Sequence, residues 1–188
     1  AFVDYFIDVM NEKAGFNSKV VLCQPIAPGL ADMINEQEGL YTLFLRGFQD
    51  GQKVNKKRII SCVSRCLNPY QDFDAVLDCA SNPDLRFIAC NTTEAGIAYD
   101  SSCQFTDIPA SSYPGKLTQF LYRRFEKFGT VPGKGFIILS CELIDDNGKE
   151  LEKCVLQYAK QWNLGEAFIA WIKTENTFCS TLVDRIVT

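Results

Sequence analysis

The sequence predicts an α/β protein that has a mainly parallel sheet, helices on both faces and an inserted β-hairpin. Three observations lead to this prediction: short apolar segments without alternation, amphipathic segments between them, and one strong hairpin signal. Apolar segments of this length are typical of strands that are buried on both faces, as in parallel sheets. Because strand-like and helix-like segments alternate along the chain, successive strands are expected to be parallel.

Three short apolar segments are predicted to be interior strands of one parallel sheet, namely Val20–Cys23, Phe87–Cys90 and Phe136–Ser140. Two longer segments, Leu40–Phe48 and Val54–Cys66, alternate apolar and polar residues and flank the turn signal Asp50-Gly51. We therefore expect these two longer segments to pair as an antiparallel hairpin.

Helices are predicted from apolar spacing and from capping residues. The first helix is expected to bury a face that includes Tyr5 and Phe6. Asp72 is expected to cap the third helix, and the turn at 145–148 (DDNG) is expected to cap a later one. Residues 97–113 have no clear period and are expected to form a loop. The expected helices span residues 2–13, 30–38, 73–80, 114–128, 149–162 and 166–173.

The composition excludes several classes of protein. A chain of 188 residues with 47% hydrophobic and 22% charged residues suits one soluble globular domain of moderate size. The net charge of −4 provides no electrostatic footprint for nucleic acid or for an anionic membrane. No segment approaches the ~20 apolar residues that a transmembrane helix requires. Partners of these two kinds are therefore not expected.

Nine cysteines are present, but their pattern favours neither disulfides nor a metal site. The number is odd, most lie in apolar segments, and no CxxC pair occurs at zinc-site spacing. We expect free, mostly buried thiols in a reducing cytoplasm and no bound metal. Histidine is absent, which excludes Ser-His-Asp and Cys-His nucleophile systems. Acid–base chemistry would need Lys, Glu, Asp or Tyr, or a group from outside this chain.

Polar residues follow two of the buried strands. The run Asn91–Gly96 (NTTEAG) follows the strand at Phe87–Cys90, and Glu142 follows the strand at Phe136–Ser140. Open α/β sheets bind ligands at the carboxyl ends of their strands, and the glycine at 96 allows a close backbone approach. The sequence therefore predicts a site at this edge. The alternative, solvated polar turns after ordinary core strands, stays open.

Five motifs in order resemble the long-chain mannitol dehydrogenase family, and the resemblance covers essentially all 188 residues. It implies a partial Rossmann-type NAD-binding domain within an NAD-dependent oxidoreductase. The family's Gly-rich phosphate turn is expected immediately before Ala1, and its helical C-terminal domain, with the catalytic lysine, is expected to be absent. The motifs are NTTEAG at 91–96, YPGKLTQFLYRRF at 113–125, LSCELIDDNG at 139–148, QWNLGEAFIAWI at 161–172 and FCSTLVDRIVT at 178–188.

The resemblance also implies roles for individual residues. Glu94 matches the acidic residue of the family's T-E-x-G motif, and Asp184 matches the aspartate of its V-D-R-I motif. Both are expected to support catalysis, and Arg185 is expected to contact the substrate. For Asp184 and Arg185 an ion pair between domains stays open as the alternative. The residues expected around the cofactor are Asn91, Thr92, Glu142 and Ser180.

One departure bears on the substrate. Mannitol-type members have Asp-Asn where this chain has Glu142-Leu143, and a leucine cannot donate a hydrogen bond to the reacting oxygen. The resemblance therefore favours the branch that interconverts the sugar acids D-tagaturonate and D-altronate, and NAD as cofactor follows from that branch. Residues 1–188 alone are expected to be inactive. Two alternatives stay open: a polyol (mannitol- or fructuronate-type) dehydrogenase, and a non-enzymatic α/β binding or regulatory module.

Overall fold

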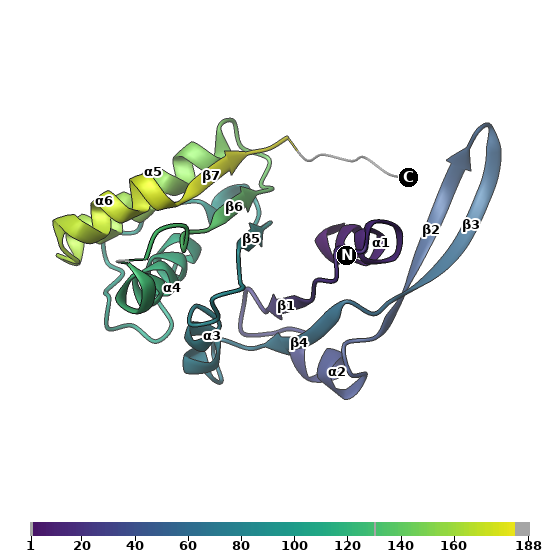
Figure 1. Ribbon diagram of the computed structural model, residues 1–188, viewed down its shortest axis with the longest axis horizontal. Coiled ribbons are helices and arrows are strands. Elements are labelled where there is room, and N and C mark those ends of the chain that lie inside the picture. Colours follow the sequence, from purple (N-terminus) through teal and green to yellow (C-terminus); the bar gives the residue numbers. More distant parts are fainter. Residues whose placement is uncertain (1, 130, 183–188) are drawn as a thin grey trace. The chain divides into compact units, whose positions relative to one another are not determined.

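The computed structural model describes residues 2–129 and 131–182, and the chain divides into two compact units, residues 1–71 and 72–188 (Figure 1). Each unit has its own hydrophobic core. The helices and strands of the first unit are α1 (Phe2–Ala14), β1 (Val20–Cys23), α2 (Ala31–Glu36), β2 (Tyr41–Gln49), β3 (Gln52–Ile60) and β4 (Val63–Leu67).

The first unit contains two separate strand pairs. Strands β2 and β3 form the predicted antiparallel hairpin, with Gln49 opposite Gln52 at its tip. Asp50 and Gly51 between them have φ angles of 53° and 77°, the left-handed values that a tight two-residue hairpin turn requires. Strands β1 and β4 pair in parallel.

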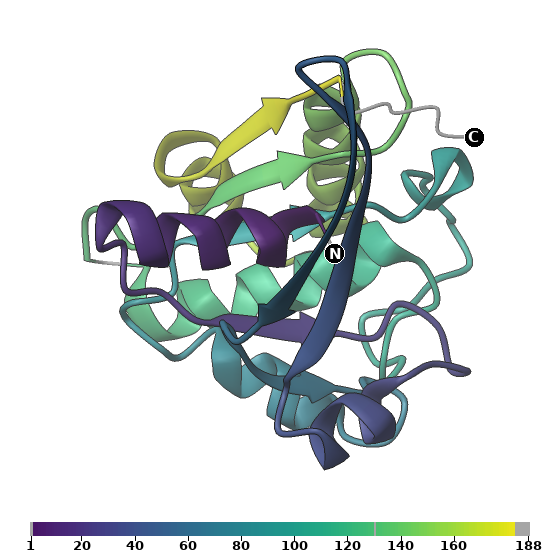
Figure 2. The same cartoon turned by 90° about the vertical axis from the view of Figure 1, so that its right-hand side faces the viewer.

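The second unit contains a three-stranded parallel sheet in the order β5-β6-β7. Figure 2 shows β6 and β7 as neighbouring arrows that point the same way. A 3-10 turn at Glu94–Gly96 (η1) follows β5, and residues 97–112 form the expected loop. The regular elements are α3 (Phe73–Cys79), β5 (Phe87–Cys90), α4 (Tyr113–Phe128), β6 (Ile137–Ser140), α5 (Asn147–Gln161), α6 (Glu166–Glu175) and β7 (Thr177–Ser180).

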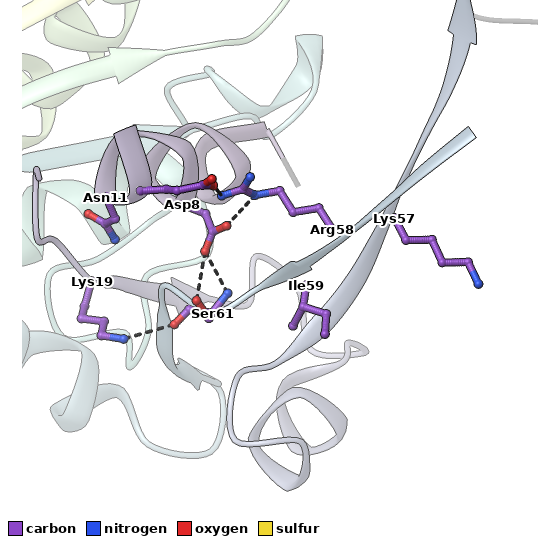
Figure 3. Close-up of a pocket in the computed structure, with 8 residues that line it drawn as sticks. Asp8, Asn11, Lys19, Lys57, Arg58, Ile59 and Ser61 are labelled. Carbon is purple, nitrogen blue, oxygen red and sulfur yellow. Dashed lines mark hydrogen bonds and ion pairs between the residues drawn. The ribbon is translucent and has the colours of Figure 1, made fainter. Parts of the chain in front are cut away.

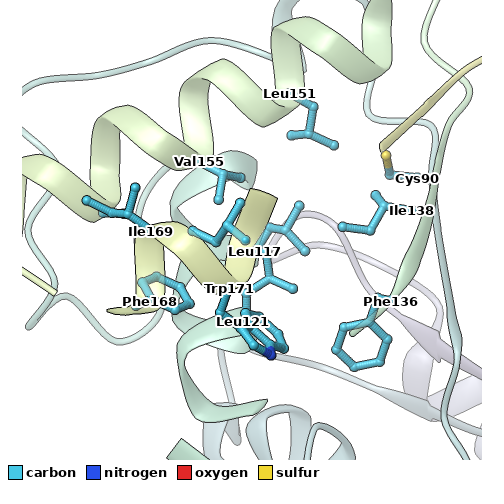
Figure 4. Close-up of a cluster of buried hydrophobic side chains, with 12 residues drawn as sticks. Cys90, Leu117, Leu121, Phe136, Ile138, Leu151, Val155, Phe168, Ile169 and Trp171 are labelled. Atoms are coloured by element: carbon cyan, nitrogen blue, oxygen red, sulfur yellow. The ribbon is translucent and has the colours of Figure 1, made fainter. Parts of the chain in front are cut away.

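The core of the second unit lies where β6 meets α4, α5 and α6 (Figure 4). The inward face of α4 is the predicted one, because Leu117 and Leu121 are buried there. Fully burying an aliphatic or aromatic side chain contributes about 1.5–3 kcal/mol, so this cluster is the main stabilising element of the unit. Its buried members from the other elements include Ile138, Leu151, Val155, Phe168 and Ile172.

Two strand predictions need correction, and one strand was missed. Val20–Cys23 is a parallel strand, but its ladder partner is β4, and among the described residues no ladder bond joins it to β5 or β6. The segment Val54–Cys66 is divided at Ser61-Cys62 into β3 and β4, because its two halves pair with different strands. Strand β7 was not predicted, since four residues at the edge of a sheet carry little pattern of their own.

The buried face of α1 also differs from the prediction. Phe6 is 58% exposed, whereas Asp4 and Asp8 are buried. Each carboxylate has partners that no helical pattern reveals. The Tyr41 hydroxyl donates to Asp4, and Arg58 donates to Asp8 at 2.6 Å. A buried charge is tolerated when it is paired and hydrogen-bonded, so polar contacts, as well as apolar ones, orient this helix.

Candidate functional site

The site expected from the sequence lies at the carboxyl edge of the second unit's sheet. The ladder places Cys90 of β5 opposite Ser140 of β6, and Ser140 opposite Ser180 of β7. The three strands therefore end side by side, and the residues that follow them start at the same edge of the sheet. The prediction that the two polar clusters meet is confirmed, because Glu142 contacts Thr92 directly.

Glu142 is 1% exposed and occupies the centre of this edge. Its Oε1 atom accepts hydrogen bonds from the backbone amide of Thr92 at 3.0 Å and from the Thr92 hydroxyl at 2.9 Å. The thiol of Cys90 donates to its Oε2 atom at 3.6 Å. Burial and the adjacent Glu142 carboxylate raise the pKa of Cys90 to about 12, so this thiol stays protonated and remains a donor at neutral pH.

The turn after β5 has an unusual backbone. Thr93 has φ 82° and ψ 166°, a region that is essentially restricted to glycine. The amide of Gly96 donates to the Thr93 carbonyl at 3.0 Å and closes η1. A Cβ atom at Gly96 would lie 2.1 Å from the Thr92 hydroxyl oxygen, so only glycine fits there. The turn therefore fixes the backbone of Glu94, whose side chain lies outside the described part of the structure.

A second side chain connects the other two strand ends. Asn147, which is fully buried, donates from Nδ2 to the carbonyls of Glu142 and Thr181 at 2.8 and 2.9 Å. Its Oδ1 atom accepts from the amides of Gly148 and Thr181 at 2.8 and 3.0 Å. The turn at 145–148 leads into α5 as expected, but the helix begins at Asn147, two residues earlier than predicted. Asp146 is the N-cap residue of α5 with φ 52°, but its side chain makes no capping hydrogen bond, and the side chain of Asn147 accepts from the Gly148 amide instead.

Close packing brings the first turn of α5 onto β7. A Cβ atom at Gly148 would lie 2.6 Å from the Cys179 carbonyl carbon, so this position accepts only glycine without rearrangement. The Gly148 amide also donates to the Ser180 hydroxyl at 3.2 Å. The Thr181 hydroxyl donates to the Ser140 carbonyl at 2.6 Å. Asn147 and Gly148 were not among the expected site residues, although the sequence DDNG marked their position as a turn.

The structure places four of the seven expected site residues at this edge. Asn91 and Ser180 are exposed, Thr92 is half-buried, and Glu142 is buried. Asp184 and Arg185 lie outside the described residues, as does the side chain of Glu94. Leu143 is 48% exposed next to Glu142.

A pocket in the first unit has a different character (Figure 3). Its volume is about 650 Å³, and ionic groups between α1 and β3 line it. Asp8 binds Arg58 at 2.6 Å and the Ser61 amide at 3.0 Å, and Arg58 also pairs with Glu12 at 2.7 Å. Burial acts to raise the pKa of Asp8, but the bonds from Ser61 and Arg58 outweigh it and lower the pKa overall. These groups bind one another, which indicates an ion-pair network that holds α1 on the hairpin.

All nine cysteines are free thiols, and six of them are buried. Within residues 2–129 and 131–182, no group of three acidic or cysteine side chains is arranged to hold a metal ion. No helix in that part of the chain has both the length and the apolar content needed to cross a membrane.

Comparison with protein families gives one match over the whole chain. The model described as the mannitol dehydrogenase Rossmann domain matches residues 1–188. The chain belongs to the mannitol dehydrogenase family. It is therefore a Rossmann domain of a dehydrogenase family, the type of α/β domain that binds dinucleotide cofactors.

Similar proteins in the family are altronate oxidoreductases. The chain is 49% identical over 189 residues to altronate oxidoreductase from Klebsiella pneumoniae subsp. pneumoniae, with 100% of this chain and 39% of that protein covered. It is 51% identical over 187 residues to altronate oxidoreductase from Phocaeicola vulgatus, with the same coverage. The chain thus spans about two fifths of the length of the curated relatives that it matches.

Solved structures share the fold at lower identity. The mannitol 2-dehydrogenase of Pseudomonas fluorescens, in a ternary complex with NAD and D-mannitol, superimposes with a TM-score of 0.76 at 22% identity. The match covers 94% of this chain and 37% of that one. A substrate-free D-sorbitol dehydrogenase gives a TM-score of 0.74 at 19% identity, with 94% and 38% covered. These matches confirm the α/β fold class that was predicted from the sequence.

Proposed function

We propose that the full-length protein carrying this chain is a cytoplasmic, NAD-dependent oxidoreductase that interconverts D-tagaturonate and D-altronate. The observation that carries the proposal is the 49–51% identity to altronate oxidoreductases over the whole of this chain. The cofactor supplies the hydride that moves to or from the carbonyl carbon of the sugar acid. The protein binds and orients both molecules, and a lysine of the family's second domain is the expected proton donor.

The carboxyl edge of β5-β6-β7 has features that fit a dinucleotide. The strained Thr93 and the close packing of Gly96 on Thr92 and of Gly148 on the Cys179 backbone keep the loops at this edge compact. The exposed Asn91 and Ser180 offer hydrogen-bonding groups at the same edge. NAD as the cofactor is supported by the P. fluorescens neighbour, whose complex contains NAD and D-mannitol.

The substrate proposal is supported by Leu143. This side chain is 48% exposed beside Glu142 and has no group that can bind a hydroxyl. A site for mannitol-type polyols would need a donor there, whereas a sugar acid offers its carboxylate to cationic groups. Arg185, which the family resemblance implies as a substrate contact, is the cation we propose for that role, and Asp184 beside it in the sequence would support catalysis.

Glu94→Gln in the full-length enzyme tests the proposed site. We expect kcat/KM for tagaturonate to fall at least tenfold, equivalent to about 1.4 kcal/mol of transition-state stabilisation, with an unchanged melting temperature. Glu126→Gln, the same substitution at an exposed position of α4, is the matched control and should leave both values unchanged. If Glu94→Gln instead loses thermal stability and keeps its turnover, Glu94 is structural.

Residues 1–188 alone should show no measurable tagaturonate-dependent NADH oxidation.

A further inference from the structure

We propose that Glu142 is a positioning residue, whose buried carboxylate fixes the Thr92–Gly96 turn and thereby places Glu94 at the edge of the sheet. The sequence suggested instead that Glu142 contacts the cofactor. Its 1% exposure and the engagement of both carboxylate oxygens by Thr92 and Cys90 favour the positioning role. The catalytic part of this inference rests on the proposed function, because it assumes that Glu94 acts on the substrate.

The ladder of the sheet ends just before the turn. The last backbone hydrogen bond between β5 and β6 runs from the Cys141 amide to the Cys90 carbonyl at 2.9 Å. Beyond Cys90 the chain leaves the sheet, so the Thr92 amide has no strand to pair with. The Glu142 carboxylate replaces the missing carbonyl and accepts this amide at 3.0 Å. A buried donor left without an acceptor is costly, so the position of the turn depends on this contact.

The conformation of the turn makes such an anchor necessary. Thr93 adopts a φ of 82°, which a β-branched residue avoids unless surrounding contacts impose it. On one side of Thr93, the amide of Thr92 donates to Glu142. On the other side, the Thr93 carbonyl accepts from the Gly96 amide. Removing the first contact should allow the backbone at 92–94 to relax toward ordinary φ values, and this would move Glu94.

The anchor is itself held in place. Asn147 donates to the backbone carbonyl of Glu142 at 2.8 Å, and Asn147 is joined to Thr181 through both of its side-chain atoms. The protonated Cys90 thiol contacts the second carboxylate oxygen of Glu142 from the β5 side. The carboxylate therefore connects β5 to a fixed point on β6, and a shift of its position would require several bonds to break together.

Three substitutions in the full-length enzyme test this role. Glu142→Gln keeps an oxygen that can accept from Thr92, Glu142→Asp withdraws the carboxylate by one methylene, and Glu142→Met removes the acceptor at similar volume. Glu150→Gln is the control, because this carboxylate is near the start of α5 but pairs with Lys153 in a solvent-exposed contact at 3.2 Å. The Asp variant keeps the test usable if the Met variant does not fold.

Two readouts are measured on each variant. Amide hydrogen exchange over residues 91–96 should be at least tenfold faster in the Met and Asp variants and near wild type in the Gln variant. With saturating substrates, kcat should fall at least tenfold in the Met and Asp variants, while the Kd for NADH changes less than threefold. The Gln variant should keep kcat within about threefold of wild type.

Other outcomes overturn the proposal in distinguishable ways. A tenfold rise in the Kd for NADH with unchanged exchange would make Glu142 a direct cofactor contact. A lower melting temperature with unchanged exchange and kcat would make it purely structural. If the wild-type enzyme does not act on tagaturonate, the proposed function fails. The exchange measurement still decides whether Glu142 holds the turn.

Discussion

At the scale of single residues, Arg124 is a charged side chain that is almost completely buried. It is 1% exposed, and its guanidinium lies over the rings of Phe128 and Phe136 at 4.6 and 4.7 Å. Burial lowers its pKa, but the charge is stabilised by carbonyl dipoles that surround it. The carbonyls that accept its hydrogen bonds, at 2.6–3.1 Å, are those of Ala80, Asn82, Leu85 and Lys134.

Replacing Arg124 should therefore destabilise the second unit strongly. Arg124→Met leaves several carbonyls without a donor, and we expect the free energy of unfolding to fall by about 3 kcal/mol or more. Urea denaturation measures this loss. Arg123→Met removes an exposed arginine from the same helix and should change stability by less than about 0.5 kcal/mol. Equal effects of the two substitutions would contradict the role given to Arg124.

At the scale of elements, the loop at 97–112 is held on α5 by polar side chains. The Tyr158 hydroxyl, which is buried, accepts from the Asp100 amide at 2.9 Å and bonds the Ser112 hydroxyl at 2.8 Å. Gln161 and Trp162 donate to the Cys103 carbonyl, both at 3.0 Å. A loop without regular structure keeps one conformation when its backbone groups are bonded in this way.

Tyr158→Phe tests how far this loop depends on one hydroxyl. We expect a loss of about 1–3 kcal/mol in stability, because the Asp100 amide loses its acceptor inside the protein. Hydrogen exchange over 99–103 should also become faster. Tyr99→Phe removes a more exposed hydroxyl, bonded to Gln161 at 2.6 Å, and serves as the control with little expected effect. Unchanged exchange in Tyr158→Phe would show that the remaining bonds suffice.

At the scale of the whole molecule, the buried thiols should make the free energy of unfolding depend on pH in the alkaline range. Burial raises the pKa of five of them, Cys62, Cys66, Cys90, Cys141 and Cys154. A group whose pKa is raised by folding stabilises the protein below its unfolded pKa, and this contribution is lost as pH rises through the folded pKa. For Cys90 that window extends from about 9 to about 12.

The free energy of unfolding should therefore decrease as pH rises from 9 to 11. Each such thiol contributes a slope of up to about 1.4 kcal/mol per pH unit. Cys90→Ala should reduce the slope, because it removes the thiol whose pKa rises to about 12. Urea titrations at several pH values measure these slopes. A stability that is constant or increases over this range would contradict the assignment.

The sequence by itself determined the local elements and the family. Helix α4 was predicted to within one residue, and Asp72 caps α3 as expected by accepting from the Ala75 amide at 2.9 Å. Apolar spacing and capping depend on residues within one or two helical turns, so they can be recognised without long-range contacts. The meeting of the Asn91–Gly96 run with Glu142 was also predictable, because parallel strands place their carboxyl ends at one edge.

Tertiary structure alone decided which partner each element found. Strand β1 pairs with β4, the buried face of α1 carries Asp4 and Asp8, and Asn147 binds the strand ends. Many of these contacts join residues that are far apart in the sequence, as in the bonds from Thr181 to Asn147, 34 positions apart, and from Cys62 to Asp4, 58 positions apart. Such pairings depend on the reach of side chains across packed elements. No local pattern contains that information.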